Sequence, residues 1–146
     1  MINGFFRQGR GPEPYVRIGL DLPLLSPSPW VAVSFLVDTG ASQTCLHPRD
    51  ATTFFGTPRA RLLDPNQWPR VADSGGVGGA AIYFPLPVRY GFVHTDGREE
   101  IIEGTIAVGQ LTATNEWIPS LMGWDLLQHF RLDLHGRNKT VSLDRV

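Results

Sequence analysis

The sequence contains a single cysteine, Cys45, among its 146 residues. An intrachain disulfide and a thiolate metal cluster are therefore both excluded. A nucleophilic thiol would need a nearby base, and the short segment around Cys45 is more typical of a small core residue. The histidines show no close ligand spacing, so we expect locally bonded or solvated side chains, and neither a metal nor a cofactor, at His47, His94, His129 and His135.

An excess of charge of one sign is also missing, because 13 basic residues oppose 14 acidic ones. Without a basic run, we expect neither nucleic acid nor a membrane surface as a partner. Apolar stretches long enough to span a membrane are absent, and residues 1–14 lack the apolar run of a signal peptide. The simplest expectation is a soluble, cytoplasmic protein.

Glycine and proline, in contrast, are abundant: 16 and 12 residues punctuate many short apolar segments. This rhythm is typical of an all-β domain. We expect residues 15–146 to form one domain, preceded by an N-terminal arm at residues 1–14. Strand character is found at residues 15–22, 30–37, 82–93, 101–108, 131–134 and 140–143.

Some of these segments carry more detailed predictions. Residues 30–37 are almost continuously apolar, as expected for a strand that is buried on both faces. Pro85 and Pro87 cannot donate to a ladder, so their strand should be interrupted or lie at an edge. We expect short helices near residues 50–55 and at residues 124–130, and a hairpin formed by the last two strands.

The first segment that suggests chemistry is Asp38-Thr39-Gly40, which directly follows the apolar strand. A carboxylate there would emerge from the sheet into a tight turn, where Gly40 allows close backbone approach. Asp and Gly also build ordinary turns. The tripeptide alone therefore favours a purely structural turn.

The second segment is Gly75-Gly76-Val77-Gly78-Gly79, a mobile tip of the kind used where backbone approaches a ligand. Residues 76–81 also match a dinucleotide-binding fingerprint, but that site needs a following helix, and the proline-containing residues 82–87 cannot form one. No Lys-Ser or Lys-Thr follows, which excludes a phosphate-binding loop. A plain hairpin tip is the structural alternative.

The third segment covers residues 121–127, where an apolar strand end meets Gly123 and then the expected helix. Asp125 lies in the first turn of that helix, where a carboxylate complements the helix dipole. We therefore expect Asp125 to stabilise the helix start rather than to act in catalysis.

Taken in this order, the three segments resemble the retropepsin family, the dimeric retroviral-type aspartic proteases. FLVDTGAS at residues 35–42 resembles the catalytic strand and turn, and GGVGG resembles the tip of the flap that covers the substrate. SLMGWDLL at residues 120–127 resembles the strand and helix beneath the active site. The resemblance spans residues 15–144 and implies an all-β, closed-barrel acid-protease fold with one short C-terminal helix.

The resemblance also implies the activity of an aspartic endopeptidase. Because the chain contains one Asp-Thr-Gly, the active site would form in a homodimer, where the two Asp38 carboxylates meet across a twofold axis. They would share a proton: one half activates the attacking water, and the other protonates the leaving amine. Thr39 would brace this pair, and Gly40 would donate a backbone N–H to the carboxylate.

The same resemblance implies the residues that bind the peptide substrate. These are Ala41 and the flap residues Gly75, Gly76, Val77, Gly78 and Gly79. Ile82 and Phe84 are further candidates for the walls of the site.

The chain departs from the family pattern in two places. Many retroviral members have Asp two residues after the Asp-Thr-Gly glycine and Arg after the helix-start glycine, whereas this chain has Ser42 and Trp124. Both partners are absent together, so no buried charge is left unmatched. The ending, residues 130–143, resembles that of the DNA-damage-inducible shuttle proteins, which implies an interface built with a hairpin from each subunit.

Two alternatives to the enzyme remain open. A retropepsin-like dimer could bind peptides with little or no turnover, and a structural β-domain could contain Asp-Thr-Gly by chance. The order of the three segments favours the enzyme over both.

Overall fold

The structure, a computed structural model, describes residues 1–23, 30–51, 71–74, 81–109 and 117–146. Helix α2 (Trp124–Leu127) is a single turn, and residues 48–51 are also helical. The strands are β1 (Ile2–Asn3), β2 (Phe5–Gln8), β3 (Pro12–Asp21), β4 (Val31–Val37), β5 (Cys45–Leu46), β6 (Val71–Ser74), β7 (Ala81–Val93), β8 (Glu99–Gly109), β9 (Leu121–Met122), β10 (Phe130–His135) and β11 (Thr140–Arg145).

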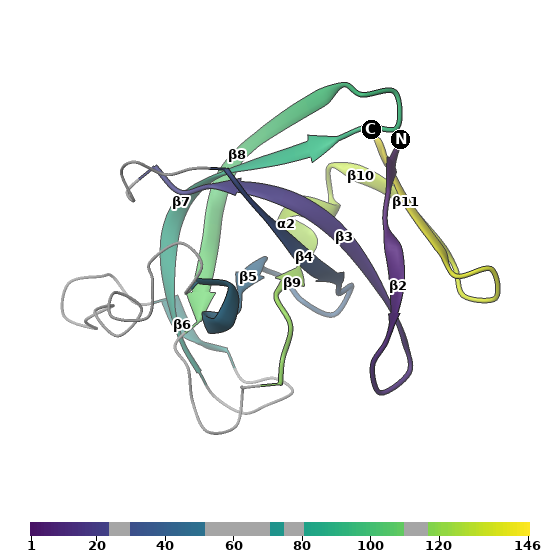
Figure 1. The fold of residues 1–146 in the computed structure, drawn as a ribbon. Helices are drawn as coiled ribbons and strands as arrows, with labels where there is room; N and C mark the ends of the chain where they lie inside the picture. The colour runs from purple at the N-terminus through teal and green to yellow at the C-terminus, as the bar shows by residue number, and fades with distance from the viewer. Residues whose placement is uncertain (24–29, 52–70, 75–80, 110–116) are drawn as a thin grey trace.

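The larger sheet closes into a barrel (Figure 1). Its strands follow the order β2-β3-β4-β9-β5-β8-β7-β6, and β3 pairs additionally with β7, which completes the ring. The short strand β9 runs parallel to β4, opposite Leu36 and Val37, and antiparallel to β5. The all-β closed barrel expected from the sequence is therefore confirmed.

Strand β4 alternates in burial instead of being covered on both faces. Val33, Phe35 and Val37 are buried, whereas Ser34 and Leu36 are only partly buried. Successive side chains of a strand point to opposite faces of the sheet. The prediction that both faces are buried is therefore wrong. The outer face of β4 is partly exposed and can contact groups outside the core.

Strand β7 runs without interruption through both of its prolines. It pairs with β8 from Tyr83 to Val93, whereas β6 reaches only its start and β3 only residues 89–91. Pro85 and Pro87 are two residues apart, so their nitrogens face the same side. At these two prolines, β8 is the one strand among the described residues that pairs with β7. Of the two predicted alternatives, the prolines therefore occupy a local edge, and the strand is not interrupted.

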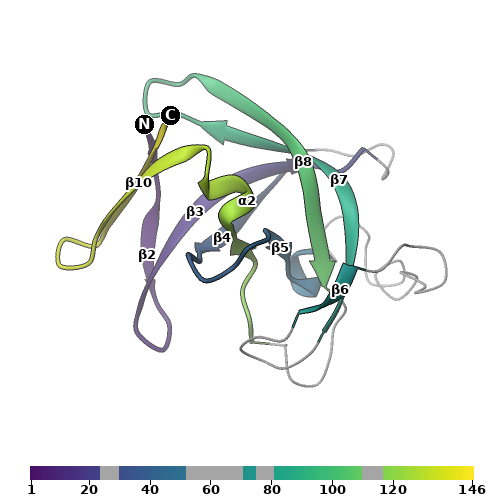
Figure 2. The ribbon, with the colours of Figure 1, turned by 180° about the vertical axis from the view of Figure 1, so that it is seen from behind.

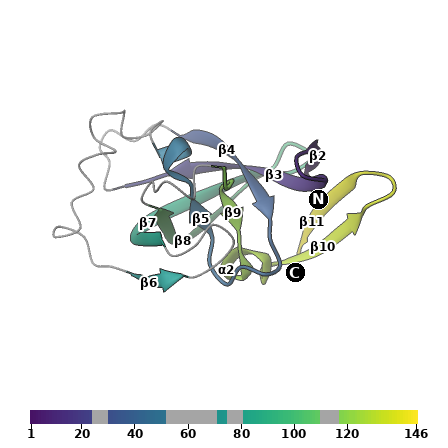
Figure 3. The same ribbon diagram turned by 90° about the horizontal axis from the view of Figure 1, so that it is seen from below.

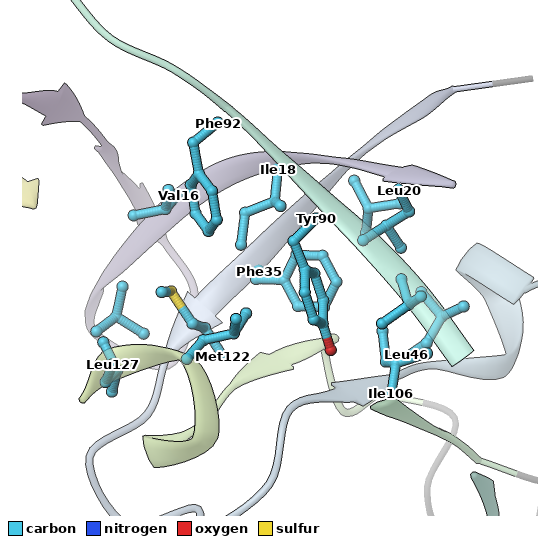
Figure 4. Packing of buried hydrophobic residues seen from close by; sticks show 14 of the residues in the cluster. Val16, Ile18, Leu20, Phe35, Leu46, Tyr90, Phe92, Ile106, Met122 and Leu127 are labelled. Carbon is cyan, nitrogen blue, oxygen red and sulfur yellow. The ribbon is translucent and has the colours of Figure 1, made fainter. Parts of the chain in front are cut away.

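The core fills the inside of the barrel (Figure 4). Phe35 of β4 and Tyr90 of β7 lie at its centre and are almost completely buried. The Tyr90 hydroxyl donates to the Thr105 carbonyl at 3.2 Å, and burial raises the pKa of Tyr90 far above its usual range. Phe84, expected as a wall of the site, is 0% exposed and belongs to this core.

The second sheet joins the two ends of the chain, in the order β1-β11-β10. The predicted hairpin is confirmed, with Phe130 opposite Arg145 and His135 opposite Thr140, and it projects away from the barrel (Figure 3). Helix α2 ends at Leu127, so the prediction of a helix through residue 130 is wrong. Phe130 is buried as the first residue of β10 and cannot continue the helix.

The N-terminal residues pair with both sheets. Strand β1 lies beside β11, and the ammonium of Met1 is 3.5 Å from the Asp144 carboxylate. Strand β2 pairs with the start of β3, from Phe5 opposite Tyr15 to Gln8 opposite Pro12. Within the described residues, no helix has the length and apolarity needed to cross a membrane.

Two facing glycines make room for an indole where the barrel closes. Gly19 of β3 lies opposite Gly91 of β7. A Cβ at Gly91 would lie 3.0 Å from Cζ3 of Trp30, and a Cβ at Gly19 would lie 3.4 Å from its Cε3. The ring thus covers the seam between β3 and β7, and the Arg89 guanidinium lies 5.4 Å from its centroid.

We expect Gly91→Val to destabilise the protein by about 1–3 kcal/mol, because the added methyl groups overpack the ring of Trp30. Urea unfolding followed by circular dichroism measures the change. Gly104→Val is the matched control, since a Cβ there would meet only Tyr90 at an ordinary 3.5 Å. Equal stability of both variants would contradict the role of the glycine pair.

Candidate active site

Asp38 follows the last residue of β4 and is partly buried. Its backbone N–H donates to the Met122 carbonyl of β9 at 3.1 Å, which continues the parallel pairing by one residue. Because side chains alternate along a strand, the Asp38 carboxylate lies on the same outer face as Leu36. The end of β4 thus presents a carboxylate on the open side of the barrel wall.

The turn after Asp38 folds back onto its carboxylate. The Gly40 N–H donates to Asp38 Oδ1 at 2.9 Å, and the Ala41 N–H donates to the Asp38 carbonyl at 3.2 Å. A Cβ at position 40 would lie 3.2 Å from the same carboxylate oxygen. Glycine therefore lets the backbone donate without crowding, and the hydrogen bond expected from Gly40 is present.

Helix α2 lies against the end of the barrel where β4, β5 and β9 meet (Figure 2). The first N–H groups of a helix have no partner within it. Here, Trp124 N–H donates to the Ala41 carbonyl at 3.0 Å, and Asp125 N–H donates to the Ser42 carbonyl at 3.2 Å. A Cβ at Gly123 would lie 2.5 Å from the Gln43 carbonyl carbon, so only glycine allows this approach.

A buried hydroxyl and a carboxylate fix this contact. Asp125 Oδ1 accepts the Thr44 N–H at 2.9 Å and the Thr44 hydroxyl at 2.6 Å, while Thr44 is 0% exposed. The Thr44 hydroxyl in turn accepts the Gly123 N–H at 3.1 Å. Asp125 also accepts the N–H of Leu126, as expected for the helix start. The role of Thr44 could not be predicted from the sequence, because no local signal connects residues 81 positions apart.

Trp124 makes a further contact with the turn. Its indole Nε1–H donates to the Thr39 carbonyl at 2.7 Å, although the side chain is 51% exposed. This is the position where many retroviral enzymes have arginine. In this chain, a neutral N–H donor reaches the Asp38 turn, so no charge needs a partner at this position.

A second polar link supports β4 from the other side. The backbone carbonyl of Ser120 accepts the Leu36 N–H at 2.8 Å. The Ser120 hydroxyl accepts the His47 N–H at 2.9 Å and donates to the Asp50 carboxylate. The Nδ1 of His47 accepts the Arg49 N–H at 3.1 Å, so this histidine is locally bonded. In the described part of the chain, no group of three or more His, Cys, Asp or Glu is placed to hold a metal.

Cys45 lies close to the site but is unsuited to nucleophilic chemistry. Burial is the main cause that raises the pKa of its thiol to about 12, and the charges of Asp125 and Asp38 act in the same direction. The thiol is therefore protonated near neutral pH, whereas the thiolate is the reactive form.

The remaining predicted site residues fall in two groups. Ala41 is partly buried directly beside the Asp38 turn, and Thr39 is exposed there. Gly75, Gly76, Val77, Gly78 and Gly79 lie outside the described residues, as does the side chain of Ile82. The segment that contains the glycines connects β6 to β7, whose facing ends are Ser74 and Ala81.

Known structures share this architecture. No protein-family model and no curated protein matches the chain. The EIAV protease complexed with the inhibitor HBY-793 is 22% identical, with 80% of this chain and 86% of that chain covered and a TM-score of 0.48. A retropepsin-like aspartic protease from Rickettsia conorii is 21% identical, with 96% and 87% covered and a TM-score of 0.52. The chain has the retropepsin type of acid-protease fold that the sequence predicts.

We expect Thr44→Val to destabilise the protein by about 1–3 kcal/mol, because it removes a hydroxyl that bonds both Asp125 and Gly123 and leaves buried polar groups unsatisfied. Urea unfolding followed by tryptophan fluorescence measures the effect. Thr105→Val, at an exposed position of β8, is the control and should change stability little. A loss no larger than that of the control would argue against the buried link.

Proposed function

We propose that this protein is an aspartic endopeptidase that hydrolyses peptide bonds as a homodimer, with Asp38 of each subunit in the catalytic pair. The observation that carries the proposal is the Asp38 carboxylate at the end of β4, with one oxygen bonded by the Gly40 N–H, within a retropepsin-type fold. The turn around it is fixed from three directions, by Met122, Trp124 and Asp125.

In the proposed mechanism, two Asp38 carboxylates face each other across the twofold axis and share one proton. The charged carboxylate takes a proton from a water, which attacks the carbonyl carbon of the peptide bond. The protonated carboxyl polarises the carbonyl oxygen, and a proton then passes to the leaving nitrogen as the C–N bond breaks. The products are a free carboxylic acid and a free amine.

The proposal of a homodimer rests on the single Asp-Thr-Gly motif of the chain, because the catalytic pair needs two such motifs. Each chain carries one Asp-Thr-Gly, and an isologous contact through the exposed Thr39 side of the turn brings the second copy to the same place. The projecting β10–β11 hairpin is a suitable second contact between subunits, because in the described part of the chain β10 pairs on one side only, with β11.

The flap belongs to the same proposal. Residues 75–79 join β6 and β7, which pair as antiparallel strands at Ser74 and Ala81. A glycine-rich tip at the end of two such strands can close over an extended peptide and bond its main chain. Closure also excludes bulk water during hydrolysis.

We expect Asp38→Asn to lower cleavage of a peptide mixture by about three orders of magnitude, in line with the loss of general acid–base catalysis. Mass spectrometry of the products across acid and neutral pH measures it. The Asp21→Asn variant, which changes a carboxylate of β3 bonded to Arg89, is the control.

Sedimentation of both proteins shows whether the dimer persists. Equal cleavage by wild type and Asp38→Asn would contradict the catalytic assignment. A folded wild-type dimer that cleaves no peptide but binds them would favour a peptide-binding module instead.

We expect Trp124→Phe to lower kcat severalfold while KM changes little. Phenylalanine keeps an aromatic ring at this position but removes the N–H that donates to the Thr39 carbonyl. Such a hydrogen bond is worth about 0.5–1.5 kcal/mol. Trp30→Phe is the control, since Trp30 is similarly exposed and lies at the seam between β3 and β7. Steady-state kinetics on one cleaved peptide separates the two parameters. A wild-type kcat in Trp124→Phe would show that the indole hydrogen bond does not position the turn.

A further inference from the structure

A groove of about 780 Å³ lies on the outer side of β2, β3 and β4. Its walls include Arg7 and Arg10 of the β2–β3 hairpin, and Trp117 just before β9. Leu36 of β4 and Tyr15 of β3 form part of its apolar surface. The groove is therefore lined by both basic and apolar side chains.

The groove continues the candidate active site along β4. Leu36 lines it, and Asp38 lies two residues further along the same face of the strand. Two residues of a strand span roughly 6.5 Å. An extended peptide whose cleaved bond lies at Asp38 can therefore place a side chain, two or three residues away, in the groove.

The Arg7 and Arg10 guanidinium groups of the groove lie against aromatic rings. Arg7 lies over the rings of Phe5 and Tyr15, at 5.2 and 5.0 Å from their centroids, and donates a long 3.4 Å bond to Ser34. Arg10 lies 4.4 Å from the ring centroid of Trp117. Among the residues that the structure describes, neither Arg7 nor Arg10 is paired with a carboxylate. Both therefore keep donors for a ligand.

The carboxylates of the groove are occupied by hydroxyl groups. Glu13 accepts the Tyr15 hydroxyl at 3.1 Å, and Asp50 accepts the Ser120 hydroxyl. With Arg49, which also lines the groove, three basic residues stand against these two acids. Among the described residues that line the groove, the charge balance is thus positive by one, whereas the whole chain carries −1.

We propose that this groove selects substrates with an acidic side chain two or three residues from the cleaved bond. Arg7 and Arg10 are the specificity-determining residues: their planar guanidinium groups match a carboxylate in geometry and charge. Leu36 and Trp117 contact the apolar part of the same peptide segment. This inference rests on the proposed function, because it takes Asp38 as the place where the bond is cleaved.

The test starts from a peptide that the protein cleaves and compares Glu, Gln and Lys at each position two and three residues from the cleaved bond. We expect kcat/KM to be about five- to tenfold higher for Glu than for Gln at one of these positions, and lower still for Lys. The preference should weaken as salt is raised, because the arginines are exposed. Equal cleavage of all three peptides overturns the inference and leaves the proposed function intact.

Charge reversal gives the sharper result. Arg10→Glu should lower kcat/KM for the Glu peptide and raise it for the Lys peptide. The double variant Arg7→Glu/Arg10→Glu should cleave the Lys peptide faster than the Glu peptide. Arg98→Glu, at an exposed position of the turn between β7 and β8, alters the net charge by the same amount and should keep the wild-type order. An unchanged preference in folded Arg10→Glu and in the double variant would overturn the proposal.

Binding to Asp38→Asn separates the two proposals. Fluorescence anisotropy with labelled Glu and Lys peptides reports the charge preference without any cleavage. If no peptide is cleaved by wild type but the Glu peptide binds several times more tightly, the groove prefers acidic peptides without hydrolysing them, and the peptidase proposal fails. Equal binding of both peptides, together with no cleavage, overturns both.

Discussion

The hydrogen bonds between Asp125 and Thr44 hold together segments that are 81 residues apart in the chain. The Thr44 hydroxyl is buried and bonded on both sides, as donor to the carboxylate and acceptor from Gly123. A buried polar group that loses its partner is costly, whereas a satisfied network specifies one arrangement. The positions of helix α2, the Asp38 turn and strand β5 all depend on this contact.

The Asp38 turn is held mainly by backbone groups and neutral donors. Met122 and Gly40 each contribute one hydrogen bond and Trp124 contributes two, and none of these residues carries a charge. An exposed ion pair would be weakened by salt and worth little. The neutral indole at position 124 gives a short, directed bond in its place. The chain therefore keeps the geometry of the turn while lacking the Asp and Arg found in many retroviral enzymes.

Much of this architecture could be predicted from short-range patterns. Alternation identified β3, the apolar run identified β4, and the order of the three segments indicated both the closed barrel and the position of Asp38. Local patterns failed where distant partners decide. Strand β7 runs through Pro85 and Pro87 because β8 pairs with it from Tyr83 to Val93, and helix α2 ends at Leu127 because Phe130 pairs with Arg145 at the start of β10. The Thr44–Asp125 contact and the position of Arg7, Arg10 and Trp117 in one groove have no signature along the chain.

The insertion of β9 between β4 and β5 has a consequence for biosynthesis. A ribosome makes Asp38 long before Leu121 and Met122, yet the pairing that fixes Asp38 needs those later residues. Until they have left the exit tunnel, β4 and β5 lack the strand between them, and the contacts to Asp125 cannot form. Such non-local pairings form late in folding because a long loop must close first. The emerging chain consequently carries Asp38 in an unorganised turn for most of translation.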